Sequence, residues 1–320
     1  MLAGTPEVAL PTLEALVAST HDVVGVVTRP DAPAGRGRRL VASPLGSAAE
    51  ALGLPVLTPR HPRDPGFAED LAALRPDCCP VVAYGAMLPE SVLGIPPHGW
   101  VNLHFSCLPA WRGAAPVQHA LLAGDEVTGA STFRLVRELD AGPVFGVLTE
   151  TVRPDDTSGV LLQRLAEHGA GLLVQTLDGI ADCTLEPRPQ PSDGASSAPK
   201  ITVADAEVRW GEPAYAIERR VRACTPAPGA WTTFRGKRLK LSPVRLAPRD
   251  PGLGAGQIRA VKDAVLVGTG SDPVGLDAVQ PPGKQAMPAL DWLRGVRVEP
   301  AERLGERLGD RLGDRLGGER

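Results

Sequence analysis

Two polar residues that can do chemistry occupy alternate positions in a short apolar run. Asn102 and His104 are interleaved with Val101, Leu103 and Phe105. Because side chains of a β-strand alternate between its faces, Asn102 and His104 point the same way if this run is a strand. An amide can donate hydrogen bonds to a developing oxyanion, and an imidazole can exchange a proton near neutral pH. The spacing therefore predicts a site for acid–base chemistry at the end of a strand.

The carboxylate that can complete this set is Asp140, which ends a strand-like run just before Ala-Gly. An acidic residue at a strand end before a glycine turn can face the same crevice as His104. Ser106 follows closely, but the Gly-x-Ser-x-Gly turn that exposes a serine nucleophile is absent. The set therefore fits direct transfer of an acyl-like group between two bound substrates. Taken singly, His104 is more often a structural histidine, Asn102 a cap and Asp140 a turn residue, so the hypothesis depends on all three.

The elements that must position these residues alternate between helices and strands. We expect a helix at 10–19, a strand at 22–28, and helix–strand units over 46–57 and 67–85. Such alternation indicates a parallel α/β sheet, whose ligands bind beyond the carboxyl ends of the strands. The sequence therefore predicts an α/β catalytic domain over residues 1–185, with the polar strand ending at its ligand-binding edge.

The character of the chain changes after a long amphipathic helix at 157–180. Residues 186–204 are rich in Pro and Ser and are typical of a linker. Residues 205–300 combine one helix with short strands and glycine turns, which predicts a smaller β-barrel of the OB type. Residues 301–320 carry a four-residue ERLG/DRLG repeat, and glycine in every repeat disfavours a helix. We expect this tail to be disordered.

Composition narrows the class of protein. Hydrophobic residues make up 43% of the 320 residues and charged residues 22%, as in ordinary globular proteins. No apolar run approaches the roughly 18 residues of a membrane span, and no signal peptide is visible. The five cysteines lack metal-type spacing, which argues against a zinc site or a disulfide framework. We expect a cytoplasmic protein without a bound metal.

The charge is distributed unevenly along the chain. Residues 29–39 hold four Arg and one Asp, and residues 200–245 hold ten Lys or Arg against four Asp or Glu. The net charge of the whole chain is nevertheless −3, so the rest of the protein is strongly acidic. Two basic islands in an acidic protein predict a polyanionic partner that contacts both.

Six segments occur in an order that resembles a known family. They are AGTPEVALPTLEAL, RPDAPAGRGRRL, VVAYGAMLPESVL, NLHFSCLPAWRGAAPVQ, LDAGPVF and DDTSG. Together they closely resemble the methionyl-tRNA formyltransferase family, a branch of the folate-dependent formyltransferases. The Asn-x-His pair with a distant Asp is shared by that wider group. The segments WRGAAP and PAGRGRRL and the C-terminal domain resemble the branch that acts on tRNA. This resemblance implies a Rossmann-like N-terminal domain joined to an OB-like C-terminal domain that helps to hold tRNA.

The resemblance also implies an activity and residue roles. A monomer would transfer the formyl group of 10-formyltetrahydrofolate, its co-substrate, to the methionyl amine of initiator tRNA. Asn102 would stabilise the oxyanion, His104 would hydrogen-bond to the formyl group and assist proton movement, and Asp140 would orient His104 and a water and help accept the amine proton. The residues implied to contact folate are Ser106, Cys107, Leu108, Pro109, Tyr84, Gly85, Met87 and Leu88. The basic residues expected to contact tRNA are Arg36, Arg38, Arg39, Lys200, Arg222, Lys237 and Arg238.

The sequence departs from the family pattern near its start and at Cys107. Only Met1 and Leu2 precede AGTPE, where the family has several more residues, so we expect a nearly absent first strand or a compromised sheet edge. Cys107 stands where the family usually has leucine, and it would add a thiol near the folate. The repeat tail is not a feature of the family.

Two other functions remain open from the sequence. A formyltransferase acting on an amino sugar nucleotide or another small amine would share Asn102, His104 and Asp140, but would not need two basic islands. A non-catalytic RNA-binding protein on a decayed enzyme scaffold would retain the basic islands without needing the three polar residues. The intact triad argues against this second alternative.

Overall fold

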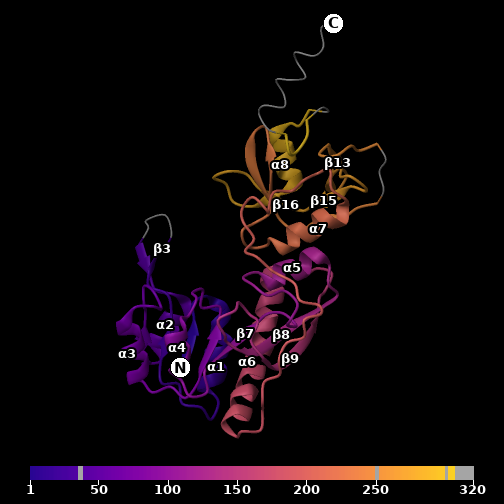
Figure 1. Cartoon of the computed structure of the whole chain (residues 1–320). Helices are drawn as coiled ribbons and strands as arrows, with labels where there is room; N and C mark the ends of the chain where they lie inside the picture. The colour runs from indigo at the N-terminus through magenta and orange to yellow at the C-terminus, as the bar shows by residue number, and fades with distance from the viewer. Residues whose placement is uncertain (35–38, 249–251, 300–301, 307–320) are drawn as a thin grey trace. The chain divides into compact units, whose positions relative to one another are not determined.

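The structure of the chain is a computed structural model that describes residues 1–34, 39–248, 252–299 and 302–306. It contains two compact units (Figure 1). The first consists of residues 1–116, 126–151 and 161–199, and the second of residues 117–125, 152–160 and the chain from 200 onward. None of the helices in the described residues is long and apolar enough to cross a membrane.

The first unit is built on a seven-stranded sheet with the order β5-β2-β1-β6-β7-β8-β9. The first five of these strands pair in parallel, whereas β8 and β9 are antiparallel additions. In chain order the strands are β1 (Leu2–Gly4), β2 (Val26–Val27), β5 (Val56–Leu57), β6 (Cys79–Val82), β7 (Trp100–His104), β8 (Val127–Arg134) and β9 (Val144–Thr151). The predicted α/β domain with a parallel-rich sheet is confirmed.

Helices connect and cover these strands. They are η1 (Glu7–Ala9), α1 (Leu10–Val17), α2 (Pro44–Ala51), α3 (Pro65–Ala73), α4 (Glu90–Leu93) and α6 (Ser158–Ala181), the last belonging to this unit from Leu161 onward. Ser43 begins α2 by accepting a hydrogen bond from the Gly46 amide at 2.9 Å, which satisfies an otherwise unpaired donor. The apolar stripe of α6 is fully buried at Leu161, Leu165 and Leu173.

The first strand is present and lies within the sheet, which corrects the expectation of a missing strand or a damaged edge. β1 pairs with β2 on one side and with β6 on the other. Leu2 and Ala3 have no exposed surface, and the amino group of Met1 donates to the Cys78 carbonyl at 3.1 Å. Three residues are sufficient here because each neighbouring strand supplies ladder hydrogen bonds and an apolar face.

β7 carries Asn102 and His104 and lies beside β8 (Figure 1), and Asp140 follows in the loop between β8 and β9. Along β7, Val101 and Leu103 are buried and alternate with Asn102 and His104. Leu103 packs against α6 at Gly169, where an added Cβ would lie 3.0 Å from both leucine δ carbons. This packing fixes one face of β7 and leaves Asn102 and His104 to line a cavity.

The second unit contains two four-stranded antiparallel sheets, ordered β10-β11-β16-β17 and β12-β15-β14-β13. Their strands are β10 (Trp231–Phe234), β11 (Lys237–Leu241), β12 (Val244–Leu246), β13 (Ile258–Val261), β14 (Ala264–Val267), β15 (Val274–Leu276), β16 (Ala278–Gln280) and β17 (Met287–Pro288). The helices are α5 (Pro116–Ala123, of which all but Pro116 belong here), α7 (Ala214–Ala223) and α8 (Ala289–Val296). Arg235 and Gly236, with φ of 49° and 72°, form the two-residue turn that joins β10 to β11.

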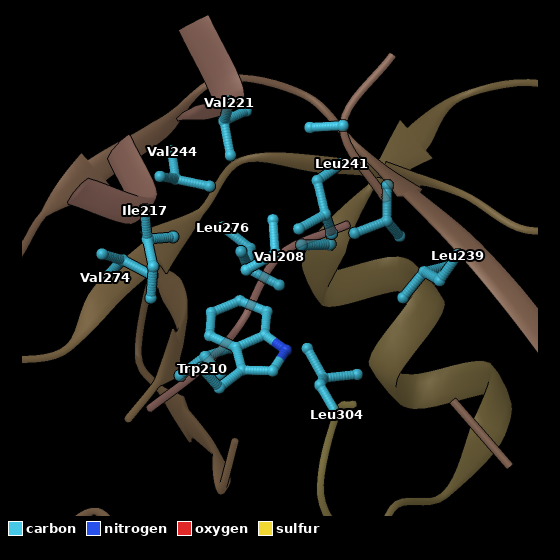
Figure 2. Packing of buried hydrophobic residues seen from close by; sticks show 14 of the residues in the cluster. Val208, Trp210, Ile217, Val221, Leu239, Leu241, Val244, Val274, Leu276 and Leu304 are labelled. Atoms are coloured by element: carbon cyan, nitrogen blue, oxygen red, sulfur yellow. The ribbon is translucent and has the colours of Figure 1, made fainter. Parts of the chain in front are cut away.

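One apolar core holds the second unit together (Figure 2). Trp210, Ile217 of α7 and Leu276 of β15 pack within it, and the Trp210 indole donates to the Thr232 hydroxyl at 2.9 Å. Leu304 joins the same core with only 3% of its surface exposed. Residues 302–306 therefore differ from the expectation of a disordered tail, and the rest of the repeat lies outside the described residues.

The remaining strands, β3 (Ala32–Ala34) and β4 (Arg39–Val41), form an antiparallel pair at the base of the first basic island. Arg39 and Leu40 are exposed on this pair. Arg36 and Arg38, which the sequence analysis assigns to tRNA, lie outside the described residues.

Candidate active site

A cavity of about 500 Å³ lies in the first unit, where the segments that follow β6, β7 and β8 come together. Its walls are mainly apolar, and Met87 and Leu139, which are among its lining residues, keep 61% and 59% of their surface exposed. Large apolar side chains exposed at the wall of a cavity are typical of a place that a ligand covers. Asn102, His104 and Asp140 all line this cavity, so the structure brings the three polar residues together.

Asn102 presents its amide to the cavity from the middle of β7. The side chain is half-buried, and within the described part of the chain its amide makes no hydrogen bond. A polar group that lines an apolar cavity without a protein partner is available to a ligand. The amide can therefore donate to an oxygen that gains negative charge during a reaction.

His104 is held in one tautomer by the backbone. Its Nε2 lies 2.9 Å from the carbonyl oxygen of Trp111. Since a carbonyl oxygen only accepts, Nε2 bears the hydrogen, and Nδ1 of the neutral ring keeps its lone pair. Burial lowers the pKa of His104 below its ordinary value of 6.5, while the Asp140 carboxylate opposes that shift. The ring is therefore a neutral base at physiological pH, with Nδ1 as the accepting atom.

Asp140 faces this same nitrogen. Its Oδ2 lies 3.8 Å from Nδ1 of His104, which is longer than a hydrogen bond, and it accepts a 2.8 Å bond from the Gly113 amide. The residue is 8% exposed and adopts a left-handed conformation with φ of 49°. Such backbone geometry is uncommon outside glycine and persists only where surrounding contacts enforce it. The 3.8 Å separation leaves both groups able to contact a third, proton-bearing group.

The predicted folate-contacting residues divide into two sets. Tyr84, Gly85, Met87 and Leu88 line the cavity. Residues 106–109 are not among the lining residues of this cavity. Ser106 donates to the Ala110 carbonyl at 2.6 Å, and the Leu108 amide donates to the Ser131 hydroxyl at 3.0 Å. These bonds tie the segment to β8 and to its own turn, and the contact of residues 106–109 with folate stays a prediction.

Cys107 is a half-buried residue of the same segment. Its thiol lies 3.8 Å from the Leu148 carbonyl oxygen. Burial raises the pKa of this thiol above its ordinary value, which lowers the thiolate fraction and with it the reactivity. The raised pKa therefore argues against a reactive thiol here, and the nearness of Cys107 to the folate stays a prediction.

The predicted tRNA-contacting residues of the second unit also divide. Lys200, Lys237 and Arg238 are exposed, and the Arg238 guanidinium stacks over the Trp231 ring at 4.1 Å. Arg222 differs because its side chain is only 11% exposed. It forms an ion pair with Glu218 and donates to the Asp156 carbonyl at 3.0 Å, so its charge is engaged inside the unit.

Two groups that orient the site were missed by the sequence analysis. The Trp111 carbonyl sets the His104 tautomer, and the Gly113 amide holds the Asp140 carboxylate. Both act through the backbone, so their residue types carry no direct signal. The positive φ values of Trp111 (59°) and Gly113 (130°) mark an unusual turn, but of the two only the glycine hints at it in the sequence.

No group of three or more His, Cys, Asp or Glu side chains in the described ranges is arranged to hold a metal ion. The arrangement that is present consists of an amide donor, a neutral imidazole base and a carboxylate around an apolar cavity. Such a set can stabilise a tetrahedral oxyanion and move a proton between two bound molecules.

Comparison with known families agrees with this chemistry. Residues 1–177 match the family described as formyl transferase, and residues 200–297 match the formyl transferase C-terminal domain. A methionyl-tRNA formyltransferase of a Nocardioides species is 64% identical, covering 95% of this chain and 97% of the relative. The Streptomyces coelicolor methionyl-tRNA formyltransferase is 62% identical over 95% and 99% of the two chains. The chain therefore belongs to the formyl transferase family, in its methionyl-tRNA formyltransferase branch.

Solved structures share the fold at low sequence identity. An N-formyltransferase from Helicobacter canadensis, in complex with folinic acid and dTDP-3-aminofucose, aligns with a TM-score of 0.63 at 15% identity, covering 86% of this chain and 97% of that one. HypX from Aquifex aeolicus in complex with tetrahydrofolic acid aligns with a TM-score of 0.58 at 20% identity, covering 77% and 43%. These likenesses support the fold class predicted from the sequence.

Proposed function

We propose that the protein transfers the formyl group of 10-formyltetrahydrofolate to the amino group of methionine on initiator tRNA, giving N-formylmethionyl-tRNA for translation initiation. The observation that carries this proposal is the meeting of Asn102, His104 and Asp140 at one apolar cavity. The identity of more than 60% to methionyl-tRNA formyltransferases over nearly the whole chain supports tRNA as the substrate. This high identity favours transfer to tRNA over transfer to a small amine. The sugar N-formyltransferase structure aligns at only 15% identity, so it supports the shared fold and not the small-amine substrate.

The reaction requires the protein to stabilise one oxyanion and to transfer one proton. The methionyl amine attacks the formyl carbon, a new C–N bond forms, and the Asn102 amide donates to the oxygen that becomes negative. His104 takes the amine proton at Nδ1, because Nε2 already bears its own hydrogen against the Trp111 carbonyl. When the bond from the formyl carbon to N10 of tetrahydrofolate breaks, that proton passes to N10. Asp140, 3.8 Å from Nδ1, stabilises the imidazolium that forms between these two transfers.

The co-substrate has a natural wall in the segment that follows β6. Tyr84, Gly85, Met87 and Leu88 line the cavity, and the exposed Met87 offers an adaptable apolar surface to a flat heterocycle. We assign the folate to this wall, and we retain residues 106–109 as the further contacts that the family resemblance implies.

We assign the tRNA contacts to the exposed cations of both units. These are Arg39 in the first unit and Lys200, Lys237 and Arg238 in the second, with Arg36 and Arg38 proposed from the sequence alone. Arg222 is left out because Glu218 and Asp156 occupy its guanidinium. We further propose that a monomer carries out the reaction in the cytoplasm, where both substrates are found.

The deciding experiment measures formyl transfer from 10-formyltetrahydrofolate to methionine-charged initiator tRNA. His104→Ala and Asn102→Ala are each expected to lower kcat/KM by about a hundredfold or more. His61→Ala is the matched control, because His61 is exposed and does not line the cavity. An amino sugar nucleotide serves as the competing acceptor. A folded wild-type protein that formylates the sugar amine but not the charged tRNA would overturn the proposal.

A further inference from the structure

We propose that residues 190–198, which the sequence presents as part of a linker, act as a strap that positions both His104 and Asp140 for the reaction. The strap lies in the first unit, and its polar contacts go to the turns that hold these two residues. Neither Ser196 nor Gln190 is among the residues that line the cavity. Both are therefore positioning residues, and their role rests on the formyl transfer proposed above.

The first arm of the strap acts on His104 through Trp111. The Ser196 hydroxyl accepts a 2.9 Å hydrogen bond from the Trp111 amide. Trp111 has φ of 59°, a left-handed conformation that a bulky residue rarely adopts without support. In this conformation its carbonyl oxygen lies 2.9 Å from Nε2 of His104 and fixes the hydrogen there. Ser196 thus supports the strained peptide that keeps Nδ1 free to accept a proton.

The second arm acts on Asp140 through Gln190. The Gln190 amide nitrogen donates to the carbonyl oxygens of Asp140 and Gly142, at 2.8 Å each. Its oxygen accepts two bonds from Arg112, at 3.0 Å from Nε and 2.7 Å from Nη2. The side-chain amide is therefore locked in one orientation, with both donors on the Asp140 turn. These bonds hold the left-handed backbone that directs the Asp140 carboxylate toward His104.

Backbone hydrogen bonds tie the strap to the same loop. The Arg112 amide donates to the Ser196 carbonyl at 2.8 Å, and the Ala198 amide donates to the Arg112 carbonyl at 2.7 Å. The Ala198 carbonyl accepts from the Ala115 amide at 3.1 Å. An added Cβ at Gly113 would lie 2.5 Å from that carbonyl oxygen, so the loop and the strap are in close contact. Movement of the strap therefore moves the Trp111 carbonyl and the Gly113 amide together.

This arrangement separates catalysis from substrate binding. Loss of the Ser196 hydroxyl removes one support of the Trp111 peptide without removing any group that lines the cavity. The expected result is a lower kcat at nearly constant KM, because only the alignment of the proton acceptor changes. A purely structural role would instead lower the amount of folded protein and leave the rate per folded molecule unchanged.

The test compares Ser196→Ala with Ser196→Thr and with Ser197→Ala. Threonine keeps the accepting hydroxyl, and the exposed Ser197 makes no side-chain hydrogen bond in the described residues. We expect kcat to fall about 10- to 100-fold in Ser196→Ala with KM changed by less than about twofold. Ser196→Thr should retain most of the activity, and Ser197→Ala should match the wild type. Gln190→Glu, which keeps the Arg112 contact but removes both donors, should lower kcat in the same way.

A second measurement does not depend on turnover. The ring ¹⁵N shifts of His104, assigned by their loss in His104→Ala, report which nitrogen bears the hydrogen. We expect a dominant Nε2–H form in the wild type and in Ser196→Thr, and a mixture of the two tautomers in Ser196→Ala. An unchanged tautomer and an unchanged kcat in Ser196→Ala would overturn the proposal that the strap positions His104. If the wild type fails to formylate charged tRNA, the proposed function fails, and the ring shifts alone decide for or against the strap.

Discussion

Gly142→Ala is predicted to disable the enzyme without touching any residue that lines the cavity. Gly142 lies two residues after Asp140, and its carbonyl accepts one of the two Gln190 bonds. A Cβ built at this position would lie 1.8 Å from the Arg134 carbonyl oxygen. Real Cβ contacts are essentially never shorter than 3.0 Å, so either Gly142 or the end of β8 has to move by about 1.2 Å.

A displacement of this size is large on the scale of catalysis. A misplacement of about 1 Å commonly costs about a hundredfold in rate, because the reacting groups no longer align. We therefore expect kcat/KM for formyl transfer to fall by at least about a hundredfold per folded molecule. Strain from the added methyl group should lower the free energy of unfolding by about 1–3 kcal/mol. Urea titration gives the folded fraction by which the kinetic values are corrected.

Gly171→Ala is the matched control. Gly171 lies inside α6, and a Cβ there meets nothing within 4 Å. Alanine at an open helical position should stabilise the protein by about 0.5–1 kcal/mol and leave kcat/KM unchanged. If Gly142→Ala matches the wild type in both rate and stability, the argument that the Asp140 turn is fixed against β8 is wrong.

Four further outcomes are expected. Because burial lowers the pKa of His104 and the neutral ring is the base, the acid limb of kcat/KM should have its midpoint below 6.5; a midpoint above that value would contradict the assigned role. The stability contributed by this histidine is fully present above about pH 6.5 and is lost as the pH falls toward the lower folded-state pKa, which pH-dependent urea titration measures. Arg238→Ala should weaken tRNA binding and reduce its salt dependence by about one phosphate contact, whereas Arg222→Ala should lower the melting temperature with little effect on that slope. Leu304→Ala should lower the free energy of unfolding of the second unit by about 2–5 kcal/mol in urea, and the exposed Leu246→Ala by less than about 0.5 kcal/mol. Equal effects of the two leucine variants would show that residue 304 does not belong to the core.

The sequence predicted best what depends on local periodicity. The helix expected at 157–180 is α6 at Ser158–Ala181, because its apolar stripe needs only one buried face to be recognised. The strand that carries Asn102 and His104 was predicted from the alternation of apolar and polar residues, which has the period of two that is typical of a strand. The charge of Arg222 was counted without its partner, although Glu218 four residues earlier is the spacing of a helical ion pair. That signal was available in the sequence.

Other features depend on contacts that the sequence does not encode locally. Leu304 lies in a repeat whose composition is typical of disorder, but a single leucine becomes part of a core once the second unit provides an apolar site beside Trp210. The short first strand forms because β2 and β6 flank it, which no inspection of three residues can show. In both cases tertiary packing supplies the stability that the local pattern lacks.

The strap, residues 190–198, depends most on contacts that are not local in the sequence. Its composition is typical of a flexible linker, whereas its proposed role is to hold two other residues in place. Pro, Ser and Gly are typical of a segment without defined structure, yet here small residues allow the chain to run close to the loop at Arg112. Its specific contacts are made mostly to backbone atoms, which every residue possesses, so no pairing of residue types points to them. Ser196 and Gln190 lie more than forty residues from the groups they orient. His104 on β7 and Asp140 in the loop after β8 therefore depend on a segment that sequence composition assigns to a linker, and only the hydrogen-bond geometry connects that segment to them.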